Sequence, residues 1–442
     1  MRVRQATGLG AAFAFSIGAA TAPAAVAGQV TAVRFGKLID GRGGAIADAV
    51  VLVEGERVVR VGSGDRAVPV DSRVLDLRRY TGIPGLIDAH THVSFAWDRS
   101  PGSRPWAQLG TLSPVVTAFL AQENLRKTLE AGVTTVRDLG SWEYIDLALR
   151  DLVARGLVVG PRLFVAGHGL HVSSAPRKAG AAPDPGLADG VAEVQRAARE
   201  QIGAGVDWIK VYGSTGSDQD VTGFQTYGLE EMKAAVDVAH RAGKRTAIHS
   251  YGPDGARDAV RAGAESVEHA TDLDDATLLE MKRRGTFYAP TVDHNRYYVD
   301  HRDEFGYGDT VIARLNDYIA RNFETLKRAV RAGVPIVMAS DAVFSGFGEN
   351  TRELEWFVKA GMTPAQALAT ATTHGAALLG RENDLGAVAP GYYADIVAVE
   401  GDPLGDIGAV VHGVRWVMKG GHVVVDRVAG QDGVESVNRR GP

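Results

Sequence analysis

The chain has 442 residues, of which 45% are hydrophobic and 23% charged, a balance typical of a globular protein rather than a disordered one. Its 48 Lys and Arg against 53 Asp and Glu give a formal net charge of -5, so the chain lacks the basic surplus that nucleic-acid binding requires. Cysteine is absent, which excludes disulfides, thiolate metal sites and cysteine nucleophiles. Any metal must therefore be held by His, Asp, Glu or a modified side chain.

The first 27 residues have the pattern of a cleavable secretory signal. Arg2 and Arg4 precede an apolar, alanine-rich run, and Ala25-Val26-Ala27 offers the small residues that a signal peptidase reads. This run is shorter than the roughly 20 apolar residues that a permanent membrane anchor needs. We therefore expect a mature chain that begins near Gly28, is periplasmic or secreted, and has no membrane anchor.

The two flanks of the mature chain, residues 28–83 and 383–442, are rich in short alternating segments that predict β-strands. Residues 49–53 and 57–61 are examples in the first flank, and residues 395–399 and 414–418 are examples in the second. We expect the two flanks to pair into one small β-sandwich beside the central domain.

The central part, residues 84–382, repeats one unit: a helical stretch, a glycine, and then a short apolar run. Glycine adopts the left-handed conformation at helix ends that other residues resist, so each unit is typical of a helix followed by a buried strand. The glycines are Gly132, Gly205, Gly243, Gly263 and Gly333, each after an alanine, and Gly285 without one.

Two further runs, residues 83–93 and 163–167, bring the number of predicted strands to eight. Eight strands alternating with helices over this length indicate an α/β protein with a (β/α)8 TIM-like barrel. A doubly wound open sheet is the alternative. It is disfavoured by the strand count and because no G-x-G-x-x-G turn follows the first strand.

Ionisable side chains stand at the ends of five predicted strands. Catalytic groups of such barrels lie at this end, where the loops begin. Burying so many ionisable groups without a ligand would be costly, whereas imidazoles and a carboxylate are suitable ligands for Zn²⁺ or a similar cation. The residues are His90 and His92 on the first strand, Lys210 on the fourth, His249 on the fifth, His269 on the sixth and Asp341 on the eighth.

Lys210 does not fit this set as an ammonium group, because an ammonium has no lone pair to offer a cation. Reaction with carbon dioxide would convert it into a carbamate, an anion with two oxygens able to bridge two metals. We therefore hypothesise a carboxylated Lys210.

In this order the residues resemble the amidohydrolase superfamily, specifically its binuclear branch with a carboxylated lysine. The motifs that carry the resemblance are Pro84-Gly85-Leu86-Ile87-Asp88-Ala89-His90-Thr91-His92, Trp208-Ile209-Lys210-Val211, Val267-Glu268-His269-Ala270, Ala339-Ser340-Asp341-Ala342 and Gly391-Tyr392-Tyr393-Ala394-Asp395-Ile396-Val397. The resemblance implies two divalent ions, most simply Zn²⁺. His90, His92 and Asp341 would bind one ion, His249 and His269 the other, and carboxylated Lys210 would bridge them.

Within the superfamily the chain is most similar to the imidazolonepropionase-like group, which contains prolidase-type dipeptidases. This similarity implies substrate contacts by Tyr251 and by His168, for which His171 is a rival. The expected function is hydrolysis of an amide bond in a small peptide or N-acyl amino acid by a metal-bridging hydroxide, with Asp341 as general base and acid. Five other histidines are assigned to the surface or to packing: His240, His294, His301, His412 and His422.

Two other functions remain open from the sequence. The same binuclear site could serve a lactonase, a cyclic-imide hydrolase or a phosphotriesterase, because activated hydroxide attacks all of these electrophiles. A non-catalytic periplasmic binding protein with a structural metal is the second alternative. The expected partner is a small molecule or dipeptide, with no nucleic acid, and a homo-oligomer is left open.

Overall fold

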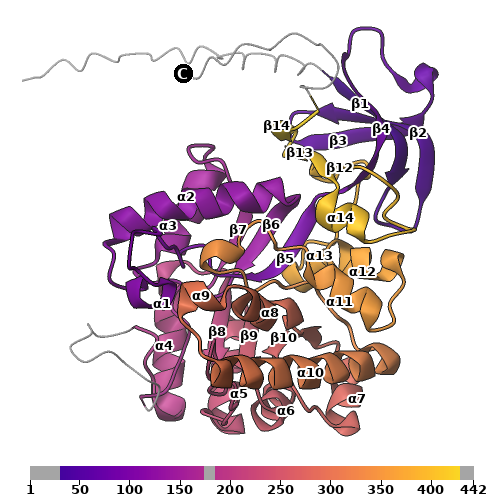
Figure 1. The fold of residues 1–442 in the computed structure, drawn as a ribbon. Helices are drawn as coiled ribbons and strands as arrows, with labels where there is room; N and C mark the ends of the chain where they lie inside the picture. Colours follow the sequence, from indigo (N-terminus) through magenta and orange to yellow (C-terminus); the bar gives the residue numbers. More distant parts are fainter. Residues whose placement is uncertain (1–29, 174–184, 429–442) are drawn as a thin grey trace, which may run out of the picture.

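The computed structural model describes residues 30–173 and 185–428 (Figure 1). The predicted signal sequence, residues 1–27, and the end of the second flank lie outside the described residues. Within the described ranges, none of the helices combines the length and the hydrophobicity needed to cross a membrane.

The central domain contains two parallel sheets. The first has the order β5-β6-β7 and the second the order β11-β10-β9-β8. The strands are β5 (Leu86–Thr91), β6 (Val133–Asp138), β7 (Arg162–Val165), β8 (Trp208–Tyr212), β9 (Arg245–Ser250), β10 (Ser266–His269) and β11 (Phe287–Ala289). Seven of the eight predicted barrel strands are therefore regular strands.

The eighth predicted strand, at residues 336–338, closes the barrel without forming a regular strand. Single parallel bridges join Ile336 to Tyr288 of β11 and Ala342 to Thr91 of β5. On the β5 side, Ala89 N donates to Met338 O at 2.9 Å. On the opposite side of the barrel, a bridge between Leu170 and Val211 joins the two sheets. These contacts are consistent with a TIM-like barrel, and they place the first and eighth strand positions side by side.

Helices surround the sheets (Figure 1). The surrounding helices are α2 (Pro114–Glu130), α3 (Ile145–Ala154), α4 (Gly190–Ala204), α5 (Leu229–Arg241), α6 (Pro253–Ala262), α7 (Asp275–Arg284) and α10 (Asp309–Ala332). The others are α1 (Pro105–Gln108), α8 (Val292–Asp300), α9 (Arg302–Phe305), α11 (Glu353–Lys359), α12 (Pro364–Thr370), α13 (Thr373–Leu379) and α14 (Gly408–His412), with 3-10 turns at Asp65–Ala67 and Phe344–Gly346.

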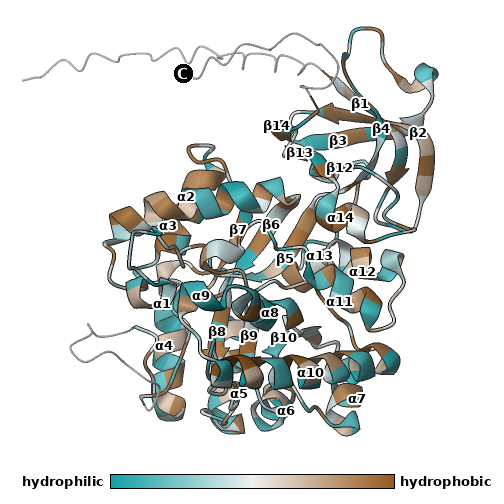
Figure 2. Cartoon of the chain, viewed as in Figure 1, coloured by the Kyte–Doolittle hydropathy of each residue, from teal (hydrophilic) through white to brown (hydrophobic). Residues whose placement is uncertain are grey.

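Four of the glycines predicted to end helices do so in the structure. Gly205, Gly263, Gly285 and Gly333 end α4, α6, α7 and α10 with φ between 73° and 98°, in the left-handed region that favours glycine. Figure 2 shows hydrophobic residues along β8 and β9 and a mixed surface on α10, whose buried side includes Leu315, Leu326 and Ala329. α10 therefore buries an apolar stripe on one side of the helix.

The two flanks form one seven-stranded mixed sheet of order β14-β13-β12-β4-β1-β2-β3. β12 lies antiparallel to β4 and so joins the second flank to the first. Phe35, Val51, Ile396 and Trp416 are buried in its core. The strands are β1 (Thr31–Ile39), β2 (Ala45–Glu54), β3 (Arg57–Ser63), β4 (Arg73–Pro84), β12 (Ile396–Val399), β13 (Val414–Lys419) and β14 (His422–Asp426).

Candidate metal centre and active site

The polar residues predicted at the strand ends gather at the carboxyl ends of the barrel strands. His90 lies in β5, Lys210 in β8, His249 in β9 and His269 at the end of β10. His92 follows β5 directly. All of these residues are buried, with exposed fractions of 7% or less. Since parallel strands end on one side of a barrel, residues far apart in the sequence meet here.

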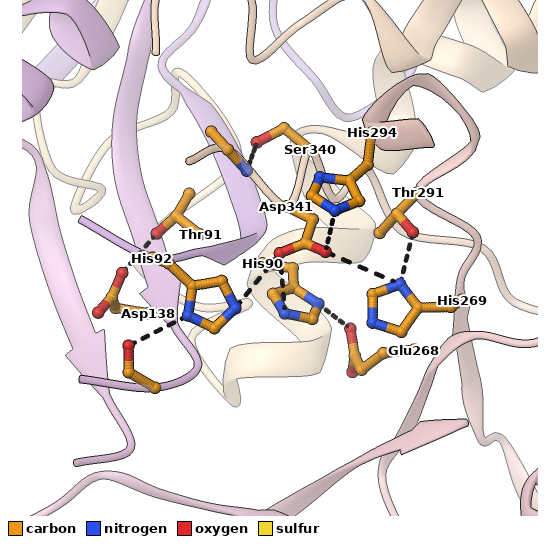
Figure 3. A network of polar contacts seen from close by, with 12 residues as sticks. His90, Thr91, His92, Asp138, Glu268, His269, Thr291, His294, Ser340 and Asp341 are labelled. Carbon is orange, nitrogen blue, oxygen red and sulfur yellow. Dashed lines mark hydrogen bonds and ion pairs between the residues drawn. The ribbon is translucent and has the colours of Figure 1, made fainter. Parts of the chain in front are cut away.

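Asp341 lies at the centre of the histidines (Figure 3). Its Oδ1 is 3.3 Å from His92 Nε2 and 3.5 Å from His90 Nε2, and its Oδ2 is 3.9 Å from His269 Nδ1. Ligand atoms of His90, His269 and Asp341 all lie within 4.8 Å of one another. Two imidazoles and a carboxylate at this spacing suggest a metal site, because they offer the nitrogen and oxygen ligands that zinc-like cations take.

A polar contact to Nδ1 fixes the orientation of three histidine rings. His90 Nδ1 lies 3.0 Å from Glu268 Oε2, His92 Nδ1 lies 3.1 Å from the Gly140 carbonyl oxygen, and His269 Nδ1 lies 2.7 Å from Thr291 Oγ1. Metal-binding histidines usually hold the second ring nitrogen in this way. For His90 and His92, the contacts leave Nε2 facing Asp341.

The surroundings of the His249 ring indicate whether the pocket fits a cation. Its ring centroid lies 4.6 Å from that of His269. Its Nε2 is buried and has no hydrogen-bond partner in the described part of the chain. Burial lowers the pKa of His249 well below the usual value, so the ring is neutral and carries a lone pair. A neutral, unpartnered ring nitrogen beside this cluster fits a metal ligand.

Lys210 lies next to the same cluster. Its Nζ is 3.4 Å from His90 Nε2, and the side chain is 1% exposed. Burial lowers the pKa of the Lys210 amine to about 8, which raises the share of the uncharged amine at neutral pH. Only an uncharged amine can react with carbon dioxide, so this environment favours the hypothesised carbamate.

A buried ion pair beneath the cluster was not predicted from the sequence. Arg137 of β6 contacts Glu268 at 2.9 Å, and both side chains are fully buried. Burial alone would raise the pKa of Glu268, but the Arg137 and His90 contacts outweigh it and hold that pKa at about 2. Glu268 is therefore an ionised acceptor for the His90 ring.

Alternation along β10 would place Glu268 and His269 on opposite faces of the strand. The structure instead brings both close to His90, whose ring centroid lies 5.2 Å from that of His269. His269 has a φ of 72° and Asp341 a φ of 51°, both in the left-handed region that side chains other than glycine rarely adopt. Such strained backbone is often found at functional sites.

His294 was assigned to the surface or to packing, and its position in the site was missed. It is buried on α8, and its Nε2 lies 3.2 Å from Asp341 Oδ2 (Figure 3). A cavity of about 20 Å³, enough for one water, is lined by both residues. The sequence signal was weak, because His294 follows its strand by five residues and lies on a helix.

The predicted substrate contacts lie at different places around the site. The Tyr251 ring is 2% exposed and lies 5.0 Å from His269 and 5.2 Å from His249, measured between ring centroids. His168 follows β7 and packs edge-on against Tyr144 at 4.7 Å. His171 Nδ1 lies 3.1 Å from the Gly169 carbonyl oxygen. Substrate contact by any of these residues stays a prediction.

Comparison with known proteins agrees with this architecture. The model of the amidohydrolase family matches residues 81–424. An ochratoxinase of Aspergillus niger is 30% identical over 426 residues, covering 89% of this chain and 86% of that protein. An imidazolonepropionase of Streptomyces griseus subsp. griseus is 26% identical over 386 residues, covering 81% and 87%. A solved prolidase complexed with N-methylphosphonate-L-proline has a TM-score of 0.81 at 29% identity, covering 90% of this chain and all of that one.

Proposed function

The chain belongs to the amidohydrolase family, and on this premise we propose that it hydrolyses the amide bond of a small peptide or an N-acyl amino acid. As a member of this family it is a metal-dependent enzyme that acts on carbon–nitrogen bonds. The observation that carries the proposal is the buried cluster of His90, His269 and Asp341 at the barrel mouth. The names of the relatives, a prolidase and an ochratoxinase, support a small substrate with an amide bond.

The proposed site holds two divalent ions, most simply Zn²⁺. His90, His92 and Asp341 would hold one ion, His249 and His269 the other, and a carboxylated Lys210 would contact both. When bound, the ions would lower the pKa of a water molecule and polarise the substrate carbonyl. The residues fit this role because their ring nitrogens and carboxylate converge, and because His249 Nε2 has no partner in the part of the chain described.

Asp341 is the proposed general base and acid. Its Oδ1 faces His90 and His92, while Oδ2 faces His294 at 3.2 Å and lies 3.9 Å from His269 Nδ1. Oδ2 is the oxygen proposed to accept a proton and return it to the leaving nitrogen. Tyr251 would contact the substrate, and its ring position beside His249 and His269 supports this role.

We also propose export to the periplasm or medium, supported by the signal pattern in residues 1–27. N-terminal sequencing of the exported protein should find a start near Gly28. Recovery of active protein only from the cytoplasm, with Met1 or residue 2 at its N-terminus, would contradict export.

Turnover of a substrate panel by metal-depleted and reconstituted protein tests the hydrolase function. Dipeptides, N-acyl amino acids and lactones are incubated with chelated protein before and after addition of Zn²⁺, Mn²⁺ or Co²⁺, and free amino acid is measured. We expect amide turnover only after reconstitution. Exclusive lactone turnover, or no amide turnover with any of the three ions, would overturn the proposal.

Asp341→Asn provides the matched variant for the proton-transfer role. We expect a loss of about 10²- to 10⁴-fold in kcat with the fold retained, as is typical when a general base is removed. The exposed Asp309→Asn on α10 serves as the control and should keep full activity.

A further inference from the structure

Asp88 of β5 carries a fully buried carboxylate that the proposed reaction does not use. Its exposed fraction is 0%. Its Oδ1 accepts from the backbone N–H groups of Ser340 at 2.9 Å and of His90 at 3.2 Å. Its Oδ2 accepts from the Ser340 hydroxyl at 2.5 Å and from Asn350 Nδ2 at 2.9 Å. An ionised carboxylate offers about four acceptor positions, so these donors can fill them all. Asp88 thus links β5 to the segment that carries Asp341.

Asn350 is the partner that supplies an amide donor. The residue is 1% exposed, and its Oδ1 accepts from Gly348 N at 3.1 Å, which leaves Nδ2 for Asp88. The Ser340 hydroxyl is oriented in a similar way, because its oxygen accepts from Ala342 N at 3.1 Å and keeps its hydrogen for Asp88. Each donor that faces Asp88 Oδ2 therefore has its orientation fixed by a second contact.

The segment around Asp341 is held by single contacts rather than by a regular strand. Asp341 N donates to the His90 carbonyl oxygen at 2.8 Å, and His92 N donates to the Ala342 carbonyl oxygen at 3.1 Å. In a regular sheet, an evenly spaced series of hydrogen bonds would fix the position of such a segment. Here the Asp88 side chain contributes to this, because it pairs with the residue directly before Asp341.

The backbone at Asp341 needs such support. Its φ is 51°, in the left-handed region that residues other than glycine rarely adopt. This conformation costs free energy and persists only where the surrounding contacts hold it. It also sets the direction of the side chain, whose Oδ1 lies 3.3 Å from His92 Nε2 and 3.5 Å from His90 Nε2. Contacts that hold the backbone therefore also hold the carboxylate beside the histidines.

We propose that Asp88 and Asn350 are positioning residues that keep the Asp341 carboxylate beside the proposed metal ligands. The inference rests on the proposed function, because Asp341 is a ligand and the general base of that proposal. Asp88 acts through the backbone, since it accepts from the N–H group of the ligand His90 and from that of Ser340, which directly precedes Asp341. Loss of contacts that orient metal ligands typically costs about 10- to 100-fold in metal affinity or activity.

Exchanging the two side chains tests the hydrogen bond between them. Asp88→Asn keeps the shape of the side chain but sets one amide donor against another. We expect kcat to fall about 10- to 100-fold and the dissociation constant for Zn²⁺ to rise by a similar factor. Asn350→Asp alone should lose about as much, because two carboxylates then face each other. Steady-state kinetics on metal-loaded protein and competition for Zn²⁺ with a chelator measure the two effects.

The double variant Asp88→Asn/Asn350→Asp again sets one donor opposite one acceptor. The Ser340 hydroxyl can follow the exchange, because its oxygen also lies 3.5 Å from Asn350 Nδ2. The double variant should therefore recover about 10-fold of each loss, which corresponds to one hydrogen bond to a charged group. Wild-type kcat and Zn²⁺ affinity in Asp88→Asn, or a double variant no better than Asp88→Asn, would overturn the proposal.

Asp395 offers a matched control, because it is a buried carboxylate near the opposite end of β5. Its Oδ1 accepts from Gly420 N at 2.7 Å, its Oδ2 contacts Arg162 at 2.8 Å, and its carbonyl oxygen accepts from Gly85 N at 2.8 Å. Asp395→Asn should lower the unfolding midpoint in urea but leave kcat and Zn²⁺ affinity unchanged. If Asp88→Asn behaved in the same way, its role would be structural only and the proposal would be wrong.

Ser340→Ala provides a milder variant in case Asp88→Asn does not fold. It removes one donor to Asp88 and keeps the backbone N–H, so kcat and Zn²⁺ affinity should each fall about 3- to 10-fold. Unchanged values would overturn the proposal.

The two readouts separate this inference from the proposed function. If wild-type protein hydrolysed no amide of the substrate panel, the hydrolase function would fail, and chelator competition would still decide the positioning role. Amide turnover and Zn²⁺ affinity that were equal in wild type and Asp88→Asn would overturn the positioning role alone. Wild-type protein that bound no Zn²⁺ would overturn both.

Discussion

His90 Nδ1 lies 3.0 Å from the carboxylate oxygen Oε2 of Glu268, with both side chains completely buried. The other oxygen of Glu268 contacts Arg137 at 2.9 Å, so the guanidinium group stabilises the charge that the imidazole faces. This arrangement favours the His90 tautomer with hydrogen on Nδ1, which leaves a lone pair on Nε2 for a cation. The ion pair is thus linked to the metal centre through one ring.

Glu268→Gln should reduce both stability and metal content. The substitution leaves the buried Arg137 without its anionic partner, which typically costs about 3–5 kcal/mol of unfolding free energy. It also weakens the orientation of His90, so fewer metal ions per chain are expected. Urea unfolding and elemental analysis measure the two effects.

The exposed pair of Glu280 and Arg283 on α7 offers a control, since Glu280→Gln should leave the unfolding free energy and the metal content nearly unchanged. Unchanged metal content together with unchanged stability in Glu268→Gln would contradict the role assigned to this pair.

Lys210→Ala should lose metal and activity. The alanine removes the side chain that would contact both ions after carboxylation, and its neighbours on β8, Ile209 and Val211, are apolar and cannot replace it. Short carboxylates such as acetate or propionate should restore part of the metal content and rate by filling the gap. Normal metal content and normal rate without any added carboxylate would show that Lys210 has no bridging role.

His294→Phe should lower kcat while the metal content is retained. His294 contacts Asp341 Oδ2, whereas the predicted ligand His92 contacts Oδ1. His294 is not itself a predicted ligand, so its loss should change the orientation of the carboxylate rather than the set of metal ligands. A decrease of about 10- to 100-fold in kcat is expected, with KM less affected. Steady-state kinetics and elemental analysis on the same sample provide the check, and a loss of metal equal to the loss of rate would point to a ligand instead.

The buried carboxyl group of Glu353 should make the unfolding free energy depend on pH. Its carboxyl group is buried and accepts from the backbone N–H groups of Val292 and Asp293. Burial raises the pKa of Glu353 to about 8, whereas an unfolded Glu titrates near 4.5. Between these values the folded protein holds a proton that the unfolded chain has lost. The contribution of Glu353 to stability is therefore complete below pH 4.5 and is lost as the pH rises to 8.

Glu353→Gln cannot ionise and should show a flatter decline in unfolding free energy from pH 5 to pH 8 than the wild type. Urea unfolding at four pH values across this range measures the difference, with the exposed Glu382→Gln as control. Parallel curves for Glu353→Gln and the wild type would rule out a buried, protonated Glu353.

The barrel could be predicted from the sequence because its units repeat. Glycines such as Gly205 and Gly263 mark a helix end by backbone chemistry alone, and the following apolar run is then a buried strand. The same regularity indicated which residues stand at strand ends, so His90, Lys210 and Asp341 could be grouped before their distances were known. The eighth strand position is less regular than predicted, because only isolated bridges hold residues 336–342 between β11 and β5.

Glu268 and His294 could not be predicted in the same way. Alternation along β10 separates Glu268 from His269, and only the left-handed backbone at His269 brings both toward His90. His294 depends on the packing of α8 over the strand ends, which no local pattern encodes. Sequence periodicity therefore specified the scaffold and the ends of the strands, whereas helix packing and backbone strain determined the remaining contacts.

The contacts between β5 and residues 336–342 determine how early during synthesis the metal centre can form. His90 and Asp341 are 251 positions apart, yet Asp341 N donates to the carbonyl oxygen of His90 at 2.8 Å. A ribosome must release nearly the entire barrel before these two residues can meet. Cation capture is consequently a late event in biogenesis, and a bound ion would lock the earliest and latest barrel segments to each other.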